Sequence, residues 1–239
     1  MNDRLPSVAL LAGGLSTRLR PITANIPKSL VPVAGEPFIA HQLRLLVNQG
    51  IREVVICCGF LGEQIEEYVR DGAVFGCSVS YSYDGTPLKG TGGAIKKALP
   101  KLGEHFFVMY GDSYLPIALC PVYERFLQMG KDGLMTVFRN ENQWDTSNVE
   151  FQDLTILRYD KVKITPQMQH IDYGLGILRS AAFEPWTQKD IFDLSMVYGH
   201  LVNTGQLSGY EVTQRFYEIG TPRGLNETCV MLLRLKHSG

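Results

Sequence analysis

The chain has 239 residues, of which 45% are hydrophobic and 20% charged, and its formal net charge is only -1. This composition is typical of a folded globular protein and excludes an extensively disordered chain. A nearly neutral balance offers no broad basic surface, so we expect a small-molecule ligand and no nucleic-acid partner. No apolar run approaches the roughly 20 residues of a transmembrane helix, so no membrane partner is expected.

The sequence shows neither an export signal nor a cysteine or histidine pattern typical of a metal site. The N-terminus reads MNDRLPSVALL, without a basic region followed by a long apolar stretch, which predicts a cytoplasmic protein. The five cysteines show no paired spacing such as Cys-x-x-Cys, so we expect reduced, mostly buried thiols. The five histidines form no cluster in the sequence and favour neither zinc nor a histidine base.

The first half of the chain alternates short apolar runs with amphipathic segments, which is typical of βαβ units around a mostly parallel sheet. Runs such as VVICC and FFVMY are apolar throughout, as expected for strands buried on both faces. In chain order, this pattern predicts strands at Val8–Ala12, Glu53–Cys58, Val79–Ser82, Phe106–Tyr110 and Leu134–Phe138, with helices at Pro37–Asn48 and Glu63–Arg70.

From about Asn148 the pattern changes to shorter and more polar strands, followed by two helices. The strands are predicted at Asn148–Phe151, Ile156–Tyr159 and Tyr173–Leu178, and the helices at Asp190–Asn203 and Pro222–Leu235. No repeat or long linker interrupts the chain. We therefore expect one doubly wound α/β domain over residues 1–239, with a first part at about 1–147 and a second at about 148–239.

The most informative stretch is LLAGGLSTRLRPITANIPKSLVP, from Leu10 to Pro32, where an apolar strand runs into two glycines and a basic segment. Glycine lets a phosphate approach backbone N–H groups closely, and Arg18 and Lys28 supply positive charge. The glycines alone would also fit a tight turn after a strand. The pattern is neither a P-loop, which ends in Gly-Lys-Ser/Thr, nor the dinucleotide-binding fingerprint.

The full string resembles the sugar-1-phosphate nucleotidyltransferase family, whose opening pattern is A-G-G-x-G-T-R-L-x-P-x-T followed by P-K-x-L-x-P-V. It appears here as Ala12-Gly13-Gly14, Thr17-Arg18-Leu19, Pro21, Thr23, Pro27-Lys28, Leu30 and Pro32-Val33. Three later segments resemble further family motifs in the expected order: Gly90-Thr91-Gly92-Gly93-Ala94, Gly111-Asp112 and Tyr217 to Pro222. The resemblance implies a Rossmann-like nucleotide-diphospho-sugar transferase fold.

The resemblance also implies the reaction and the nucleotide site. A nucleoside triphosphate and a sugar 1-phosphate would give a nucleotide sugar and pyrophosphate, for cell-envelope polysaccharide. Arg18 and Lys28 would act on phosphates as catalytic residues, together with Asp112 at the end of a strand. The nucleotide would contact Leu11, Ala12, Gly13, Gly14, Ser16, Thr17, Arg18, Gly90, Thr91 and Gly92. Ser16 stands where many relatives have glycine, so its φ must be accessible to a side chain.

Magnesium is the cofactor that the resemblance implies, because Mg²⁺ prefers oxygen ligands. Asp112 and Glu218 are its expected ligands. Glu218 occupies a position where the family most often has aspartate. Its longer side chain could reach the metal directly, bind it through water, or simply lie exposed before the helix that begins at Pro222.

The second part of the chain, at about 148–239, is expected to bind the sugar phosphate. The segment around Lys161 resembles the region where relatives place a lysine on this phosphate, with Lys163 as an alternative that strand alternation would send to the opposite face. Glu150 and Asp172 could bind sugar hydroxyls or form surface ion pairs. The segment at 143–145 could cap a sugar or form an ordinary loop.

The base and the sugar are less well defined by sequence. The resemblance is greatest to compact bacterial heptose and hexose 1-phosphate guanylyltransferases and to N-acetylmuramate 1-phosphate uridylyltransferases, with a slight preference for GTP. Alternatives are a UTP-dependent enzyme, a non-catalytic regulatory subunit of the same fold, and a cytidylyltransferase acting on a polyol or isoprenoid phosphate. The resemblance also allows a homo-oligomer.

Overall fold

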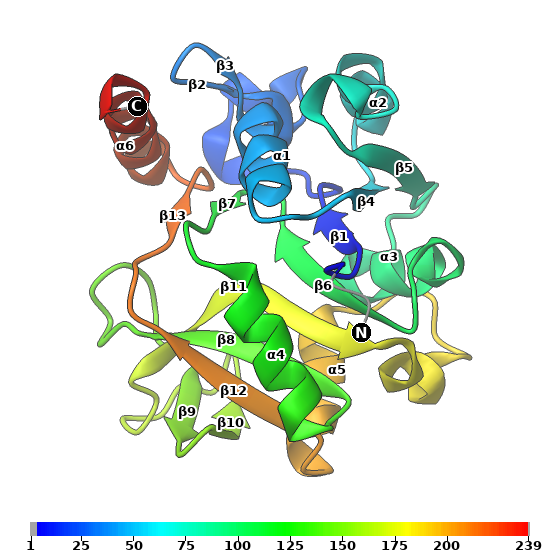
Figure 1. Cartoon of the computed structure of the whole chain (residues 1–239), viewed down its shortest axis with the longest axis vertical. Helices are drawn as coiled ribbons and strands as arrows, with labels where there is room; N and C mark the ends of the chain where they lie inside the picture. Colours follow the sequence, from blue (N-terminus) through cyan, green and yellow to red (C-terminus); the bar gives the residue numbers. More distant parts are fainter. Residues whose placement is uncertain (1–3, 239) are drawn as a thin grey trace.

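The apolar strands of the first half form the parallel part of a nine-stranded sheet in the computed structural model, which describes residues 4–238. These strands are β1 (Val8–Leu11), β4 (Glu53–Cys58), β5 (Ser78–Tyr83) and β6 (His105–Tyr110). β1 lies between β4 and β6, and β5 adds to the outer side of β4. All four run in the same direction, so their carboxyl ends meet at one edge of the sheet (Figure 1).

The second half continues the same sheet with mixed strand directions. Its strands are β8 (Gly133–Arg139), β9 (Val149–Gln152), β10 (Thr155–Tyr159), β11 (His170–Arg179) and β12 (Leu207–Val212). β11 runs antiparallel between β6 and β8, whereas β12 is parallel to β8. The order across the sheet is β5-β4-β1-β6-β11-β8-β12-β10-β9. The sheet is therefore parallel at its N-terminal side and mixed beyond β6.

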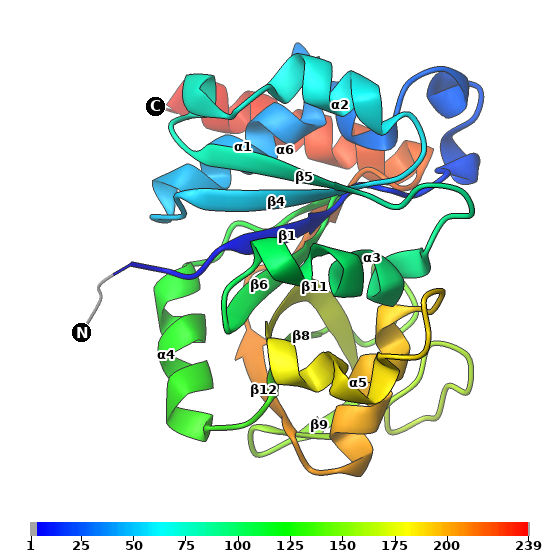
Figure 2. The same ribbon diagram turned by 90° about the vertical axis from the view of Figure 1, so that its right-hand side faces the viewer.

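Helices cover both faces of this sheet because its strands are buried on both sides. α1 (Phe38–Asn48), α2 (Gly62–Val69) and α4 (Leu119–Met129) pack on one face, and α3 (Gly90–Ala98) and α5 (Leu194–Asn203) pack on the other. Strand alternation divides β1 between them: Val8 and Leu10 join the first core, and Ala9 and Leu11 join the second. Figure 2 shows the two layers on either side of the sheet.

A third, smaller core joins the C-terminal segment to the N-terminal hairpin. The hairpin consists of β2 (Pro32–Val33) and β3 (Glu36–Pro37), and the C-terminal segment of β13 (Tyr217–Glu218) and α6 (Pro222–Ser238). β13 pairs antiparallel with β7 (Ser113–Tyr114), the short strand that follows β6. Short 3-10 helices lie at Thr17–Leu19, Ile22–Ala24, Lys28–Leu30, Ala73–Phe75, Leu99–Lys101 and Ser180–Trp186.

The predicted strands and helices all occur, with boundaries that shift by a few residues. One boundary was wrong: α5 begins at Leu194 and not at Asp190, because Asp193 caps the helix by accepting the N–H of Ser195. The cysteines are free, and Cys57, Cys58 and Cys77 are buried as predicted. Across residues 4–238, no helix has the length and apolar character that a bilayer-spanning segment requires.

Candidate active site

A cavity of about 380 Å³ opens at the carboxyl ends of β1, β4 and β6. This is the edge at which open α/β sheets bind their ligands. Its walls include nine residues predicted from the sequence: Leu11, Ala12, Gly13, Gly14, Ser16, Lys28, Gly90, Thr91 and Asp112. Thr17, Arg18 and Gly92, which were also predicted, do not line it.

The two glycines of the first loop have different structural roles. A β-carbon on Gly13 would lie 3.0 Å from the backbone nitrogen of Gly59, and one on Gly59 would lie 2.4 Å from the carbonyl oxygen of Gly13. Gly13 therefore permits close contact between the loops that follow β1 and β4. Gly14 has no atom within 4 Å of its β-carbon position. Its backbone faces open space that a phosphate could enter.

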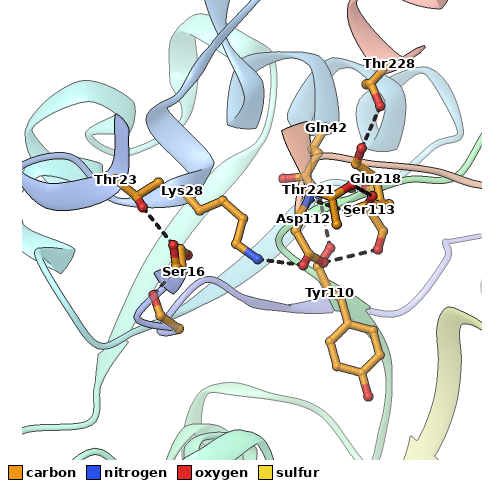
Figure 3. Close-up of polar contacts among 12 residues, drawn as sticks. Ser16, Thr23, Lys28, Gln42, Tyr110, Asp112, Ser113, Glu218, Thr221 and Thr228 are labelled. Carbon is orange, nitrogen blue, oxygen red and sulfur yellow. Dashed lines mark hydrogen bonds and ion pairs between the residues drawn. The ribbon is translucent and has the colours of Figure 1, made fainter. Parts of the chain in front are cut away.

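Ser16 adopts the left-handed conformation, with φ of 52°, which residues other than glycine rarely adopt. The loop holds it there, since its carbonyl accepts a hydrogen bond of 2.7 Å from Thr23 Oγ1 (Figure 3). Arg18 follows on the short helix Thr17–Leu19 and is exposed. Its guanidinium Nη2 lies 3.4 Å from the β-carbon position of Gly220, so it reaches from the first loop to the segment before α6.

Asp112 follows β6 and is held by side chains from two earlier segments. Lys28 Nζ forms an ion pair of 2.8 Å with Asp112 Oδ2. The buried side chain of Gln42, on α1, donates to the carbonyls of Tyr110 and Ser113 on either side of Asp112, at 3.1 and 2.8 Å. Figure 3 shows this arrangement. The Asp112 side chain remains 28% exposed, so its carboxylate is accessible to a ligand.

Glu218 is brought beside Asp112 by strand pairing. In the β13–β7 pair, Glu218 lies opposite Ser113, and the N–H of Ile219 donates to the Asp112 carbonyl at 2.9 Å. The Glu218 carboxylate turns toward the start of α6, where it accepts hydrogen bonds from the Gly220 N–H and from Thr221 Oγ1. A carboxylate has about four acceptor positions, so these contacts leave it able to bind a cation.

Gly220 leaves space where three charged side chains converge. A β-carbon there would lie 2.7 Å from Glu218 Oε2, 3.4 Å from Arg18 Nη2 and 3.5 Å from Asp112 Oδ2. Within residues 4–238, no group of three or more histidine, cysteine, aspartate or glutamate side chains could hold a metal. Two carboxylates suit Mg²⁺, which usually binds one or two carboxylates together with substrate phosphates. The donor set therefore fits the predicted cofactor.

The cavity lining also includes a carboxyl group, that of Asp84, which was not predicted from the sequence. Asp84 follows β5 and is buried; its Oδ2 accepts the Lys89 N–H at 3.0 Å, whereas its Oδ1 has no partner. Burial raises the pKa of Asp84, although the Lys89 N–H and the charges of Lys97 and Lys89 act in the opposite direction. Asp84 stands six positions before Gly90, where the glycine motif begins, and no local pattern in the sequence marks it as a ligand-binding residue.

The glycine motif at 90–94 forms the first turn of α3 and not a loop. The N–H groups of Gly92 and Gly93 donate to the Phe192 carbonyl at 3.0 and 3.2 Å. A β-carbon on Gly92 would lie 2.4 Å from the Phe192 ring. Gly92 therefore serves helix packing, whereas Gly90 and Thr91 line the cavity.

The predicted acceptor residues lie on the other side of Tyr110, a cavity-lining residue that was also missed. Lys161 is in the turn after β10, and its Nζ lies 3.4 Å from Tyr110 Oη. Asp172 accepts from Tyr159 Oη at 3.2 Å and from the Gly174 N–H at 3.0 Å, in a bulge of β11. Burial raises the pKa of Asp172, and the positive charge of Lys161 partly offsets this.

Two other predicted acceptor residues are less closely connected with this group. No strand continues through the segment after Asp160, so the alternation argument for Lys163 does not apply. The Lys163 N–H donates to Asp160 Oδ1 at 2.8 Å within that turn. Glu150 is half-buried on β9 and pairs in register with Arg158. Within the described part of the chain, no hydrogen bond or ion pair joins Glu150 to another predicted site residue.

Trp144, in the segment at 143–145, stacks against an arginine. The Arg215 guanidinium carbon lies 3.5 Å from the centroid of the Trp144 ring and 4.6 Å from that of Tyr217. Arg215 also forms an ion pair of 2.8 Å with Glu227 on α6. This contact fastens the loop to the segment that carries Glu218.

Comparison with known proteins agrees with this geometry. Residues 8–148 match the model of the family described as nucleotidyl transferase. The D-glycero-α-D-manno-heptose 1-phosphate guanylyltransferase of Campylobacter jejuni is 35% identical over 186 residues, covering 77% of this chain and 80% of the relative. The N-acetylmuramate α-1-phosphate uridylyltransferase of Neisseria meningitidis is 28% identical, covering 91% and 94%.

Among solved structures, HddC from Yersinia pseudotuberculosis superposes with a TM-score of 0.81 at 23% identity, covering 95% of this chain and all of that one. This likeness confirms the predicted nucleotide-diphospho-sugar transferase fold. The family match spans more than half of the chain and includes the glycine loop, Lys28 and Asp112. The chain therefore belongs to the nucleotidyl transferase family, among the sugar-1-phosphate nucleotidyltransferases.

Proposed function

We propose that this enzyme transfers a guanylyl group from GTP to a heptose or hexose 1-phosphate, releasing pyrophosphate. The observation that carries the proposal is a cavity whose lining includes both the glycine loop with Lys28 and the Asp84 carboxyl group. The identity to the Campylobacter guanylyltransferase supports the choice of base and sugar. We expect the reaction to take place in the cytoplasm, where nucleoside triphosphates are available.

In this reaction, an oxygen of the sugar phosphate attacks the α-phosphorus of the nucleotide. A P–O bond forms there while the bond between the α-phosphorus and its bridging oxygen breaks, and pyrophosphate leaves on the opposite side. The amides of the first loop would hold phosphate oxygens, with Gly14 facing the open space. Arg18 would stabilise the leaving pyrophosphate, Lys28 would neutralise charge at the α-phosphate, and Lys161 would bind the sugar phosphate.

A divalent metal is general in this family. We propose Mg²⁺, with Asp112 as its direct ligand and Glu218 as the second, because both carboxylates closely approach Gly220. When bound, the ion would supply positive charge to the phosphate oxygens as negative charge develops there. Nothing else in the proposal requires a cofactor.

The choice of guanine depends on the chemistry of Asp84. Guanine presents two adjacent donors, N1–H and the N2 amino group, which match a carboxylate in a bidentate arrangement. Uracil presents one N–H between two carbonyls, and a carboxylate would repel those carbonyls. Asp84 Oδ1 has no hydrogen-bond partner among the described residues, and the two adjacent donors of guanine would satisfy the Asp84 carboxylate.

The first test is pyrophosphate release with Mg²⁺, crossing the four ribonucleoside triphosphates and dTTP against heptose, hexose and amino-sugar 1-phosphates. We expect GTP with a heptose or hexose 1-phosphate to give the highest kcat/KM. In Asp84→Asn, kcat/KM for GTP should fall at least about 100-fold, because the amide replaces one acceptor oxygen with an NH2 group that would face a donor of guanine. A UTP preference in the wild type would contradict the guanine assignment and favour the uridylyltransferase alternative. If no pair of substrates released pyrophosphate, although the protein still bound a nucleotide, the non-catalytic alternative would be favoured.

A further inference from the structure

Lys161 contacts Tyr110, which lines the cavity, and lies near groups from three other segments. Its Nζ lies 5.4 Å from the ring centroid of Tyr110 and 6.0 Å from that of Tyr159. Asp193 Oδ1 lies 3.9 Å from the same nitrogen. The charge of Lys161 also acts on the buried carboxyl of Asp172. The ammonium of a long, flexible side chain thus lies beside two tyrosine rings and the Asp193 carboxylate.

Asp193 contacts the nucleotide side of the site as well. Its Oδ2 accepts a hydrogen bond of 2.9 Å from Thr91 Oγ1, a cavity-lining residue at the start of α3. The Thr91 hydroxyl in turn accepts the Leu194 N–H at 2.8 Å. Asp193 Oδ1 accepts the Ser195 N–H at 2.8 Å, which caps α5. The carboxylate therefore joins the starts of two helices and faces Lys161.

We propose that Asp193 is a positioning residue that directs Lys161 toward the sugar 1-phosphate and joins it to the nucleotide-binding Thr91. This inference rests on the proposed function, which assigns Lys161 to the acceptor phosphate. Lysine has a flexible four-carbon stem, so confining its ammonium before the phosphate arrives lowers the entropy lost on binding. Because Asp193 is the N-cap of α5, its carboxylate has a fixed place from which to act.

The test is Asp193→Asn, which removes the charge and keeps the helix cap, since asparagine caps helices as well as aspartate does. We expect KM for the sugar 1-phosphate to rise up to about fivefold, the change that an ion pair of this exposure supports. KM for the nucleotide and the melting temperature should change little. General electrostatics predicts the opposite sign, because removing a carboxylate favours an anionic substrate. A lowered or unchanged KM would therefore overturn the proposal.

Two further variants separate positioning from other effects. Asp190→Asn removes the same charge from the same segment, but Asp190 pairs with Lys96 at 3.0 Å, so the sugar-phosphate KM should not change. In a Lys161→Met background, Asp193→Asn should have no additional effect; a persisting effect would overturn the proposal. If Asp193→Asn lowered the melting temperature, Asp193→Ser, which also caps a helix, would replace it. A raised KM for the sugar 1-phosphate in Asp193→Ser would support the proposal, and a lowered or unchanged KM would overturn it. Absence of transfer by the wild type would instead contradict the proposed function itself.

Discussion

Asp112 receives contacts from parts of the chain that are far apart in sequence. Lys28 pairs with its carboxylate, and the backbone of the C-terminal segment bonds to its carbonyl through Ile219. Gln42 fixes the two residues on either side of it. These contacts direct the carboxylate toward the space above Gly220 without burying it. The carboxylate of Asp112 is thus held in place and remains accessible, so its negative charge is the property that a metal ion would use.

The substitution Asp112→Asn tests this role, because it keeps the shape and removes the charge. We expect kcat to fall at least about 100-fold, since the site loses a negative ligand for the cation that stabilises the transition state. The fold should be retained, because the side chain is partly exposed and an amide oxygen can still accept from Lys28. Pyrophosphate release and a thermal melt measure the two effects. Asp153→Asn, in the exposed turn between β9 and β10, is the control, because it removes a carboxylate away from the site. Near-normal Mg²⁺-dependent turnover in Asp112→Asn would contradict the metal assignment.

Residues in contiguous motifs could be predicted from sequence, whereas residues defined by tertiary contacts could not. Gly14, Lys28 and Asp112 each stand in a recognisable string, and all line the cavity. The left-handed φ of Ser16 was not predicted, since the pattern required only a φ that a side chain can adopt. Asp84 carries no local signal of burial, since it becomes buried only when the segment after β5 folds onto α3.

Among the secondary-structure elements, α3 shows how tertiary contacts override local propensity. Its first turn contains three glycines, which are poor helix formers, so the sequence pattern did not predict a helix there. The helix forms because the Phe192 carbonyl accepts the N–H groups of Gly92 and Gly93. The segment just before α5 therefore satisfies the donors at the start of α3, as a capping residue otherwise would.

This packing predicts a large cost for a methyl group at Gly93. A β-carbon there would lie 2.2 Å from the Asp190 carbonyl oxygen, so Gly93→Ala must push α3 away from the segment before α5. We expect a loss of about 1–3 kcal/mol in the free energy of unfolding, as is usual for overpacking. Gly199→Ala is the matched control: Gly199 lies within α5 with no atom near its β-carbon position, so alanine should stabilise the helix by about 0.5–1 kcal/mol. Urea unfolding of both variants checks the opposite signs; an unchanged Gly93→Ala would show that the two segments are not in close contact.

At the scale of the whole molecule, the C-terminal helix completes the site by packing on the N-terminal hairpin. α6 joins the core that includes Val33 and Phe38. The Thr221 hydroxyl accepts the Gly224 N–H in the first turn of α6 and donates to the Glu218 carboxylate. Figure 1 shows α6 beside β2 and β3, with β13 leading into it. The last third of the chain thus places Glu218 next to Asp112, which the first half supplies. Displacement of α6 would separate these two carboxylates.

Glu36 stabilises the packing of α6 on the N-terminal hairpin through its negative charge. Its carboxylate contacts Arg44 at 2.7 Å and Lys236, on α6, at 3.1 Å. Partial burial acts to raise the pKa of Glu36, but the hydrogen bonds from Arg44 and Lys236 and the nearby positive charges outweigh it, so the pKa lies below its ordinary value. A carboxyl group whose pKa is lowered on folding stabilises the protein above the unfolded pKa, about 4.3 for glutamate. This contribution is lost as the pH falls through the lower, folded value.

Glu36→Gln should therefore destabilise the protein in a pH-dependent way. At about pH 7 we expect a loss of about 1 kcal/mol in the free energy of unfolding. The difference from the wild type should shrink as the pH falls from about 5 to about 3.5, because the wild-type carboxylate is then protonated as well. Urea unfolding across this range measures the difference, and Glu124→Gln, at an exposed position on α4, should show none of it. A difference that stayed constant with pH would mean that Glu36 supports the hairpin through packing, and that its charge does not hold α6 in place.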